Sequence, residues 1–368
     1  MARPTAARNP VADLRRIAFL LERALESTYR VRAFRGAAAA LAPLPAEEIE
    51  RHAAEGTLTS IKGVGDVTAR VVTESLAGTV PGYLASLEEV HPGPVTTGGA
   101  ALRAALRGDC HTHSDWSDGG SPIPEMAVTA VELGHEYTVL TDHSPRLTVA
   151  NGLTADRLRK QLQVVAALHE PLAPFRLLTG IEVDILEDGG LDQDPELLGR
   201  LDVVVASVHS KLAMPREAMT ARMLTAIADP NMDVLGHCTG RLVPGERGGG
   251  GGRGRGHRGG RPESQFDAEA VFAACAERGV AVEINSRPER LDPPRRLLRL
   301  AVEAGCLFAV DTDAHAPGQL DWQPYGCERA EECGVDPARV VNTWPVTDLL
   351  AWAADHTRLP SRAGPGAA

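Results

Sequence analysis

The sequence predicts an α/β fold with a parallel sheet, preceded by a small all-α domain. Two observations support this prediction. Residues 10–90 carry apolar residues at the spacing of amphipathic helices. From residue 108 onward, apolar runs of strand length recur and a helical segment follows each of them, which is typical of a parallel sheet. A third observation, the type of residue that follows each run, indicates where a functional site lies.

Length and composition are those of an ordinary globular protein. The 368 residues suffice for one large domain and a small one, and 43% of them are hydrophobic. No segment approaches the roughly 18 consecutive apolar residues that span a bilayer, and the opening MARPTAARNP lacks the apolar core of a signal peptide. We therefore predict a cytoplasmic protein. Its cysteines form no CxxC pair, so we expect them to be reduced and buried: Cys110, Cys238, Cys275, Cys306, Cys327 and Cys333.

The net charge of −11 argues against binding of nucleic acid by bulk electrostatics. Residues 1–46 are an exception, because they hold eight arginines and only three acidic residues. The excess of acidic residues lies further along the chain. Carboxylates that hold cations would contribute to it, and so would acidic helices that face solvent.

The all-α part begins with PVADLRRIAFLLERALES, which has apolar residues at helical spacing from Val11 to Leu25. LTSIKGVGDVTARVVTESL follows, in which we expect a short helix to end at Lys62 and a second helix to begin near Asp66. Two glycines in the turn would let the backbone approach a phosphate, which the amides of the second helix would bind. Candidate DNA contacts are therefore Lys62, Gly63, Val64 and Gly65; the alternative is a hairpin that only packs.

Two segments have the composition of connecting segments and not of helices or strands. HPGPVTTGGA, from His91 to Ala100, has the composition of a linker, and GERGGGGGRGRGHRGGRP, from Gly245 to Pro262, has low complexity. We expect the second to be a disordered loop or an RGG-like segment that contacts nucleic acid. The predicted organisation is a helical domain over 1–92, a linker over 93–106, the α/β domain over 107–345 and a C-terminal helix with a flexible tail over 346–368.

The α/β part holds six apolar runs that predict buried strands. They are EYTVL (136–140), FRLLTGI (175–181), LDVVVAS (201–207), MDVLG (232–236), VAVEI (280–284) and CLFAV (306–310).

Residue types that can bind metal ions follow nearly every run. The sites are His143; Glu182; His209; His237; Glu283 with Asn285; and Asp313 with His315. GDCHTHSDWSDGG adds His111, His113 and Asp118, and the two histidines of its His-x-His pair would share one face of a strand. Because the carboxyl ends of strands in a parallel barrel lie on one face, these side chains predict a metal site with several ions. The remaining histidines lack this context and read as structural or surface residues: His52, His91, His135, His169, His257 and His356.

Residues 107–345 resemble the PHP (polymerase and histidinol phosphatase) domain. The motifs that carry the resemblance are CHTHSDWSDG, LTDHS, GIEVDI, VVASVHS, LGHCTGR, VEINSRPERLD and TDAH. The resemblance implies a distorted, TIM-like barrel of about seven β/α units with a trinuclear metal centre that hydrolyses phosphoesters.

The same resemblance implies a set of ligands. One metal would be held by His111, His113, Glu182 and Asp313, and Glu182 would bridge to a second metal held by His209 and His237. Asp118, His143 and His315 would hold a third; many relatives have a histidine near the position of Asp118. Catalytic roles would fall to Glu182, His209 and Asp313. Imidazoles with carboxylates suit zinc, manganese or iron.

Further residues near the strand ends are candidates for supporting roles. Arg241, Arg287, Arg290 and Lys211 could bind the substrate phosphate, or could be surface charges. We expect Asp109 and Asp142 to orient metal-binding imidazoles, and Glu283 and Asn285 to do the same or to face the substrate.

Residues 10–90 resemble the helix-hairpin-helix region of bacterial family X DNA polymerases, through YRVRAFRGAA and IKGVG. Those polymerases carry a nucleotidyl-transfer palm between this region and a PHP domain. Only about fifteen linker residues occupy that place here, so we expect no polymerase activity. The helix DVTARVVTESL holds no lysine, so we expect no lyase activity through a Schiff base.

Together these features predict a metal-dependent phosphoesterase that acts on DNA ends, as a 3′–5′ exonuclease or a 3′-phosphatase in DNA repair. One alternative is a phosphatase of small molecules such as histidinol phosphate or a sugar phosphate. An amidohydrolase would need a carboxylated lysine at a strand end, where His209 stands instead. A metal-bearing protein that binds DNA without catalysis is the remaining alternative.

Overall fold

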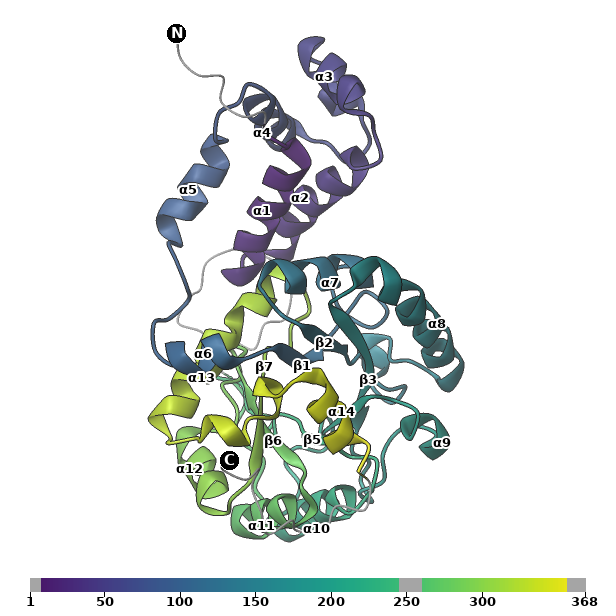
Figure 1. Cartoon of the computed structure of the whole chain (residues 1–368), viewed down its shortest axis with the longest axis vertical. Helices are drawn as coiled ribbons and strands as arrows, with labels where there is room; N and C mark the ends of the chain where they lie inside the picture. The colour runs from purple at the N-terminus through teal and green to yellow at the C-terminus, as the bar shows by residue number, and fades with distance from the viewer. Residues whose placement is uncertain (1–7, 245–259, 356–368) are drawn as a thin grey trace. The chain divides into compact units, whose positions relative to one another are not determined.

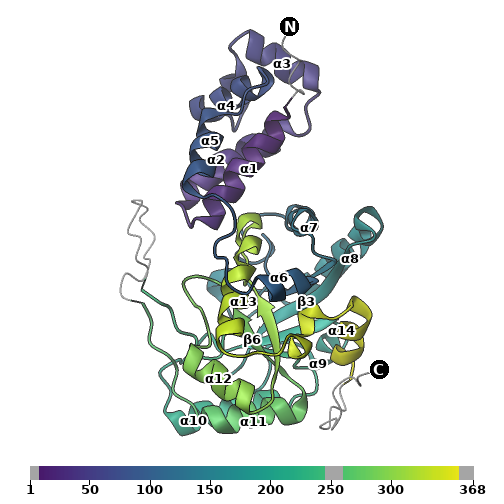
Figure 2. The same cartoon turned by 60° about the vertical axis from the view of Figure 1, so that its left-hand side comes forward.

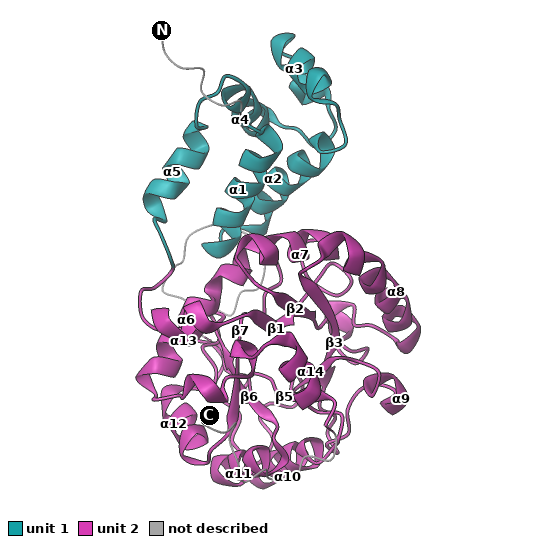
Figure 3. Cartoon of the chain, in the orientation of Figure 1, with its two compact units in different colours: residues 1–94, 247–256 teal, residues 95–246, 257–368 magenta. Residues whose placement is uncertain are grey.

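The computed structural model describes residues 8–244 and 260–355 (Figure 1). The chain divides into two compact units, with the boundary between Pro94 and Val95 (Figure 3). The segment 245–259, which holds most of the predicted Gly/Arg loop and His257, lies outside the described residues, as do the predicted tail from residue 356 onward and His356.

Helices alone build the first unit. They are α1 (Pro10–Arg23), α2 (Thr28–Leu41), α3 (Ala46–Ala54), α4 (Asp66–Leu76) and α5 (Gly82–Val90), with a short 3-10 turn, η1 (Leu58–Ser60). Helix α1 begins where the Asn9 side chain accepts the backbone N–H groups of Val11 and Ala12. It buries Leu14, Ile17 and Leu21 on one face, as the spacing of its apolar residues predicts.

Internal contacts take up much of the arginine excess at the start of the chain. Arg8 pairs with Asp13, and Arg35 makes a two-armed ion pair with the buried Glu22. Arg30 pairs with Glu26, and Arg23 donates to the carbonyl oxygens of His91 and Gly93. From residue 8 to 94 the chain has ten lysines and arginines against eleven acidic residues. The net charge of this stretch is therefore close to zero, so net charge alone gives it no attraction for a polyanion.

The hairpin has the predicted second helix but a shorter first one. Helix α4 begins at Asp66, and the Thr68 hydroxyl accepts the backbone N–H of Gly65 just ahead of it. The segment expected to be a helix ending at Lys62 is only η1, which ends at Ser60. Gly63 turns the chain at φ +99°, and a Cβ there would lie 3.3 Å from the carbonyl oxygen of Gly36. Both conditions favour glycine at this position.

Seven parallel strands form the sheet of the second unit, hydrogen-bonded in sequence order. They are β1 (Gly108–Thr112), β2 (Tyr137–Leu140), β3 (Arg176–Asp184), β4 (Val203–Ser207), β5 (Val234–Leu235), β6 (Ala281–Asn285) and β7 (Leu307–Asp311). A parallel bridge between Thr112 and Ala314 joins the first strand to the segment after the last, which closes the ring. The expected distorted barrel is thus confirmed, and the two-residue β5 is its shortest strand.

Helices surround the strands of this barrel (Figures 1 and 2). They are α7 (Ile123–Glu132), α8 (Ala155–Leu172), α9 (Pro195–Leu198), α10 (Arg216–Ile227), α11 (Ala268–Arg278), α12 (Arg295–Glu303) and α13 (Gln323–Glu332). Apolar side chains such as Tyr137, Val139 and Val205 fill the interior, and Leu349 of α14 (Val346–Ala353) extends this cluster. All six cysteines are buried and free, as predicted.

The segment expected to be a linker over 93–106 is partly ordered structure. Residues 100–105 form α6 (Ala100–Ala105), and Leu102 and Leu106 are buried in the core of the second unit. The Gly99 backbone N–H donates to Glu331, and the Thr96 hydroxyl donates to Glu328. These long-range contacts to α13 anchor the segment, and its Gly- and Thr-rich composition does not reveal them.

Two further structural findings bear on the ends of the predicted segments. Arg261, at the end of the predicted loop, pairs antiparallel with Leu242. In the described residues, no helix combines the length and apolar character that crossing a membrane requires.

Candidate metal centre

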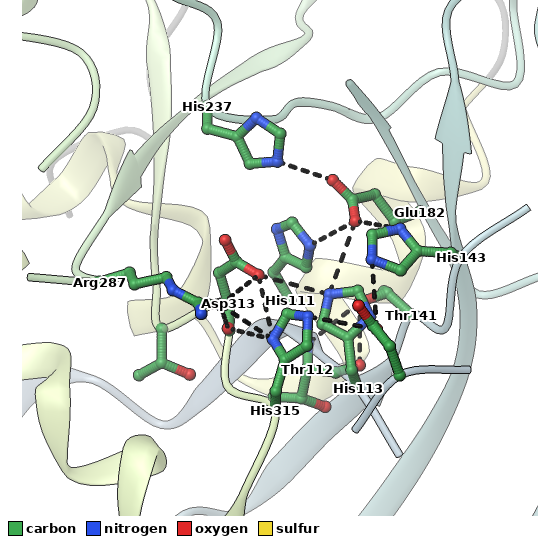
Figure 4. A network of polar contacts seen from close by, with 12 residues as sticks. His111, Thr112, His113, Thr141, His143, Glu182, His237, Arg287, Asp313 and His315 are labelled. Carbon is green, nitrogen blue, oxygen red and sulfur yellow. Dashed lines mark hydrogen bonds and ion pairs between the residues drawn. The ribbon is translucent and has the colours of Figure 1, made fainter. Parts of the chain in front are cut away.

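The nine predicted metal ligands lie near the carboxyl ends of the barrel strands or in the loops that follow them. Figure 4 shows Glu182 of β3 with His111, His143 and His237 around it. Its carboxylate is within 4 Å of five imidazoles, and its two oxygens face different ones. Oε2 lies 2.9 Å from His143, 3.3 Å from His111 and 3.6 Å from His113. Oε1 lies 2.8 Å from His237 and 3.2 Å from His209.

A second carboxylate, Asp118, faces the more open side of the cluster. Its Oδ1 lies 3.3 Å from Nε2 of His315 and 3.5 Å from Nε2 of His143. Asp313 is buried, and its Oδ1 lies 3.5 Å from both His113 and His315. The Asp118 side chain is 37% exposed whereas those of Glu182 and His111 are fully buried, so solvent reaches the cluster from the Asp118 side.

Three groups of side chains place ligand atoms close enough to hold an ion. Within each group these atoms lie within 4.8 Å of one another; the groups are His111, His113 and Glu182; His143, Glu182 and His209; and His113, Asp118, His143 and His315. His237 and Asp313 belong to none of these groups, although both touch members of them. The structure therefore brings all nine predicted ligands together.

Unpaired buried nitrogens show that the cluster suits metal ions. Nε2 of His111 and both ring nitrogens of His113 and His209 are buried without a hydrogen-bond partner among the described residues, as is Oε2 of Glu182. Burying such atoms unpaired costs free energy, so buried polar groups normally find a partner. A divalent ion would satisfy the deprotonated nitrogen of such a ring and the carboxylate oxygen, and imidazole with carboxylate suits zinc, manganese or iron.

The charges of the cluster keep its carboxylates ionised. Burial alone would raise the pKa of Glu182, but the charges of His209, His111 and His143 outweigh it and hold the pKa well below its usual range. Burial also opposes ionisation of Asp313, where Arg290 and His113 lower the pKa. The pKa of His113 is well below its usual value because of burial and the neighbouring His315 and His143. These groups are therefore in the deprotonated form that metal binding needs.

His209 and His111 differ in the absence of ions. Burial lowers the pKa of both rings, but the charges of Glu182 and Asp184 raise that of His209 to about 9, and the charges of Glu182 and Glu283 raise that of His111 well above its usual value. Metal binding to His209 must therefore release a proton near neutral pH. Asp184 also accepts the backbone N–H of His209 at 3.1 Å. Asp184 is not among the predicted site residues, although it stands two residues after Glu182 on β3 and therefore on the same face.

Asp142 and Asp109 were expected to orient metal-binding imidazoles, but their hydrogen bonds go to other groups. Asp142 accepts the backbone N–H and hydroxyl of Ser114, the hydroxyl of Ser117 and the amide of Gln161. It therefore shapes the loop that carries Asp118. Asp109 accepts the backbone N–H of His111 and both donors of Thr312. It braces the barrel where the first and last strands meet, and touches no ring.

Two of the four candidate phosphate ligands lie at the centre. Arg290 donates through Nε to Asp313 at 2.9 Å, and its buried Nη1 has no partner among the described residues. Arg287 contacts Nδ1 of His315 at 3.1 Å (Figure 4). Arg241 differs, because its guanidinium donates to the carbonyl oxygens of Arg290 and Leu291 and so supports this loop. Lys211 is exposed and contacts none of the nine ligands in the part of the chain that the structure describes.

The hairpin residues are only partly available to a ligand. Val64 is buried and its backbone N–H donates to Ile61, while the N–H of Gly65 donates to Thr68. Lys62 and Gly63 are exposed, and the first-turn amides of α4 have no partner within the helix. Asp66, also exposed, puts a negative charge at the same end of α4.

Comparisons with known proteins agree with this architecture. Residues 109–287 match the family model of the PHP domain, and residues 7–79 match that of a helix-hairpin-helix domain. Over 247 residues, 67% of its length, the chain is 36% identical to the DNA polymerase/3'-5' exonuclease PolX of Bacillus subtilis, and it spans 41% of that protein. It is 28% identical to a "Probable phosphatase" of Thermoanaerobacter sp. (strain X514), over 64% of this chain and 89% of that protein.

Among solved structures, histidinol phosphate phosphatase from Lactococcus lactis in complex with zinc, L-histidinol and phosphate aligns with a TM-score of 0.41 and 18% identity. The alignment covers 63% of this chain and 95% of that one. The family models, the barrel topology and the matched motifs assign the two units. The chain is a PHP-domain protein with a helix-hairpin-helix domain ahead of its barrel.

Proposed function

We propose that this protein is a metal-dependent phosphoesterase whose centre holds up to three divalent ions. The observation that carries the proposal is the Glu182 carboxylate, buried with each oxygen facing a different set of imidazoles. A carboxylate in this position suits two neighbouring ions, one on the side of His111 and His113 and one on the side of His209 and His237. Asp118, His143 and His315 suit a third. Zinc, manganese and iron fit these donors.

When bound, such ions acidify a water molecule and polarise a phosphoryl oxygen for in-line attack. The protein's own part is to bind and orient the phosphate. Arg290 has a buried Nη1 free to donate to a phosphoryl oxygen, while Asp313 fixes the guanidinium through Nε. Arg287 is 23% exposed at the same end and offers a second cation. Burial of Glu182, His111 and His113 lowers the local dielectric constant and strengthens these contacts.

For the substrate, we propose the ends of DNA strands. The helix-hairpin-helix match and the similarity to a DNA polymerase/3'-5' exonuclease both favour a polynucleotide. The charge balance of residues 8–94 limits how it would bind, since ten basic and eleven acidic residues give no bulk attraction. Contacts of Lys62, Gly63 and the first-turn amides of α4 to the phosphate backbone would have to provide the affinity.

Phosphate monoesters of small molecules are the second candidate. The observation in favour is that 64% of this chain matches 89% of the "Probable phosphatase" relative, so that relative has almost no length left for a further domain. On this alternative the helical domain takes no part in substrate binding.

A substrate panel decides between the two. The full-length protein is given labelled DNA with a 3′-hydroxyl or a 3′-phosphate, histidinol phosphate, a sugar phosphate and a phenyl phosphate ester, each with manganese or zinc. We expect DNA ends to be hydrolysed with the highest kcat/KM and His209→Ala to lose that activity. Hydrolysis of only the small esters would favour the alternative. Hydrolysis that survives thorough chelation, or that His209→Ala retains, would overturn the proposed centre.

A further inference from the structure

Strand β6 differs from the other six, because none of the nine ligands that the family resemblance implies stands at its end. It places Glu283 and Asn285 there instead, two residues apart on one face and both fully buried. Both are polar residues in a buried position, so their hydrogen bonds indicate their role.

The carboxylate of Glu283 joins two ligands that come from different strands. Its Oε1 lies 2.6 Å from Nδ1 of His111, at the end of β1. Its Oε2 accepts the backbone N–H of His237, after β5, at 2.5 Å. In the proposed centre His111 and His237 approach different oxygens of Glu182. Glu283 therefore links the two sets of ligands.

We propose that Glu283 is the positioning residue that holds His111 and His237 in their metal-binding geometry. This inference rests on the centre proposed above. A buried carboxylate accepts hydrogen bonds and donates none, so the proton shared with His111 belongs on Nδ1. In the neutral ring the lone pair is then on Nε2, which faces Glu182 at 3.3 Å and has no hydrogen-bond partner among the described residues. The negative charge also makes that nitrogen a stronger ligand.

Asn285 extends this support to a third ligand. Its Nδ2 donates to Oε2 of Glu283 and to Oδ2 of Asp313, each at 3.2 Å. Asp313 in turn binds Arg290. The β6 pair thus contacts ligands from β1, β5 and β7, and fixes their spacing without binding an ion itself.

Replacement of Glu283 by glutamine provides the sharpest test because it keeps the size of the side chain. One oxygen becomes an NH₂ group, so the variant can accept from His111 or from His237 but not from both. Asp233→Asn is the matched control, since Asp233 is also buried and accepts a backbone N–H, that of Val204, just before β5. Manganese and zinc binding to the full-length proteins is measured by titration calorimetry and chelator competition. Circular dichroism and unfolding of the ion-free proteins report the fold.

We expect Glu283→Gln to fold and to bind manganese about 10- to 100-fold more weakly than the wild type, the usual cost of losing an outer partner of a ligand. Asp233→Asn should bind as the wild type does. A folded Glu283→Gln with wild-type affinity and stoichiometry would overturn the inference alone. If that variant fails to fold, Glu283→Asp, which keeps the charge but shortens the reach, is held to the same criterion. A wild type that binds neither ion tightly would overturn the proposed centre as well.

Discussion

At the scale of single residues, Glu182 is the side chain with the most partners in the candidate centre. Its ionised form is stabilised by imidazoles from β1, β2, β4 and β5, which approach one or the other of its two oxygens. These neighbours were predictable from the sequence, because His143, His209 and His237 each follow an apolar run and the others form the His-x-His pair. The partners of Asp109, Asp142 and Arg241 were not, since they depend on hydrogen bonds between loops that the strand pattern leaves open.

Replacement of Glu182 by glutamine should remove bound metal and lower phosphoester hydrolysis by more than about a hundredfold. The reason is that loss of even an outer partner of a ligand costs about 10- to 100-fold, and Glu182 faces the ions directly. Metal content by mass spectrometry and kcat/KM on the best substrate check this. Wild-type metal content in the variant would contradict the role of Glu182.

His135 gives a prediction about pH away from the centre. Burial, and then the charge of Arg103, lowers its pKa to about 3, whereas in the unfolded chain the pKa is about 6.5. From pH 6.5 down toward 3, the unfolded chain takes up a proton that the folded protein does not. Stability from this group is complete above pH 6.5 and falls by up to about 1.4 kcal/mol per pH unit below it.

Urea unfolding of the ion-free protein at pH 7 and pH 5, with His135→Gln beside the wild type, measures this effect. The variant lacks the titrating group, so the wild type should lose more stability than the variant between the two pH values. Equal losses would show that His135 is protonated in the folded protein.

At the scale of elements, the order of strands and helices was predictable because each β/α unit repeats one hydrophobic pattern. Helix α6 was not, because a six-residue helix after a Gly- and Thr-rich stretch carries too little periodicity. Its position depends on Gly99, which has φ +67° and no room for a side chain. A Cβ there would lie 2.2 Å from the carbonyl carbon of Cys327 on α13.

Gly99→Ala should therefore destabilise the protein by several kcal/mol, more than the conformation alone costs. Gly334→Ala is the control, because Gly334 has φ +75° but nothing within 4 Å of its Cβ position. That variant should lose only about 1–2 kcal/mol, the cost of the left-handed conformation. Chemical denaturation measures both. Equal losses would mean that α6 does not depend on this close approach.

At the scale of the whole molecule, the metal centre and the barrel should stabilise each other. The ligands come from six strands, and an unfolded chain cannot bring them together. Ions that bind only the folded form stabilise it by about 3 kcal/mol when their free concentration is a hundred times Kd. Chelation should lower the melting temperature, and added manganese or zinc should restore it.

Glu182→Gln is the matched variant for this experiment, and its melting temperature should respond little to chelation. A wild-type melting curve that is indifferent to chelator would contradict the coupling of metal and fold. The sequence predicted the site at this scale because the carboxyl ends of parallel barrel strands all lie on one face. It could not show that Arg35 pairs with Glu22 or that Arg30 contacts the hydroxyl of Tyr83, because these contacts join different helices.

The bridge between Thr112 and Ala314 has a consequence for biosynthesis. The two chain segments that it joins are about two hundred positions apart, so a ribosome must make nearly the whole barrel before the ring can shut. With synthesis at about 5–20 residues per second, about 10–40 seconds pass between the synthesis of His111 and that of Ala314. Completion of the proposed metal centre is thus a late step of synthesis, and a message truncated ahead of Ala314 yields a product that lacks this bridge and His315.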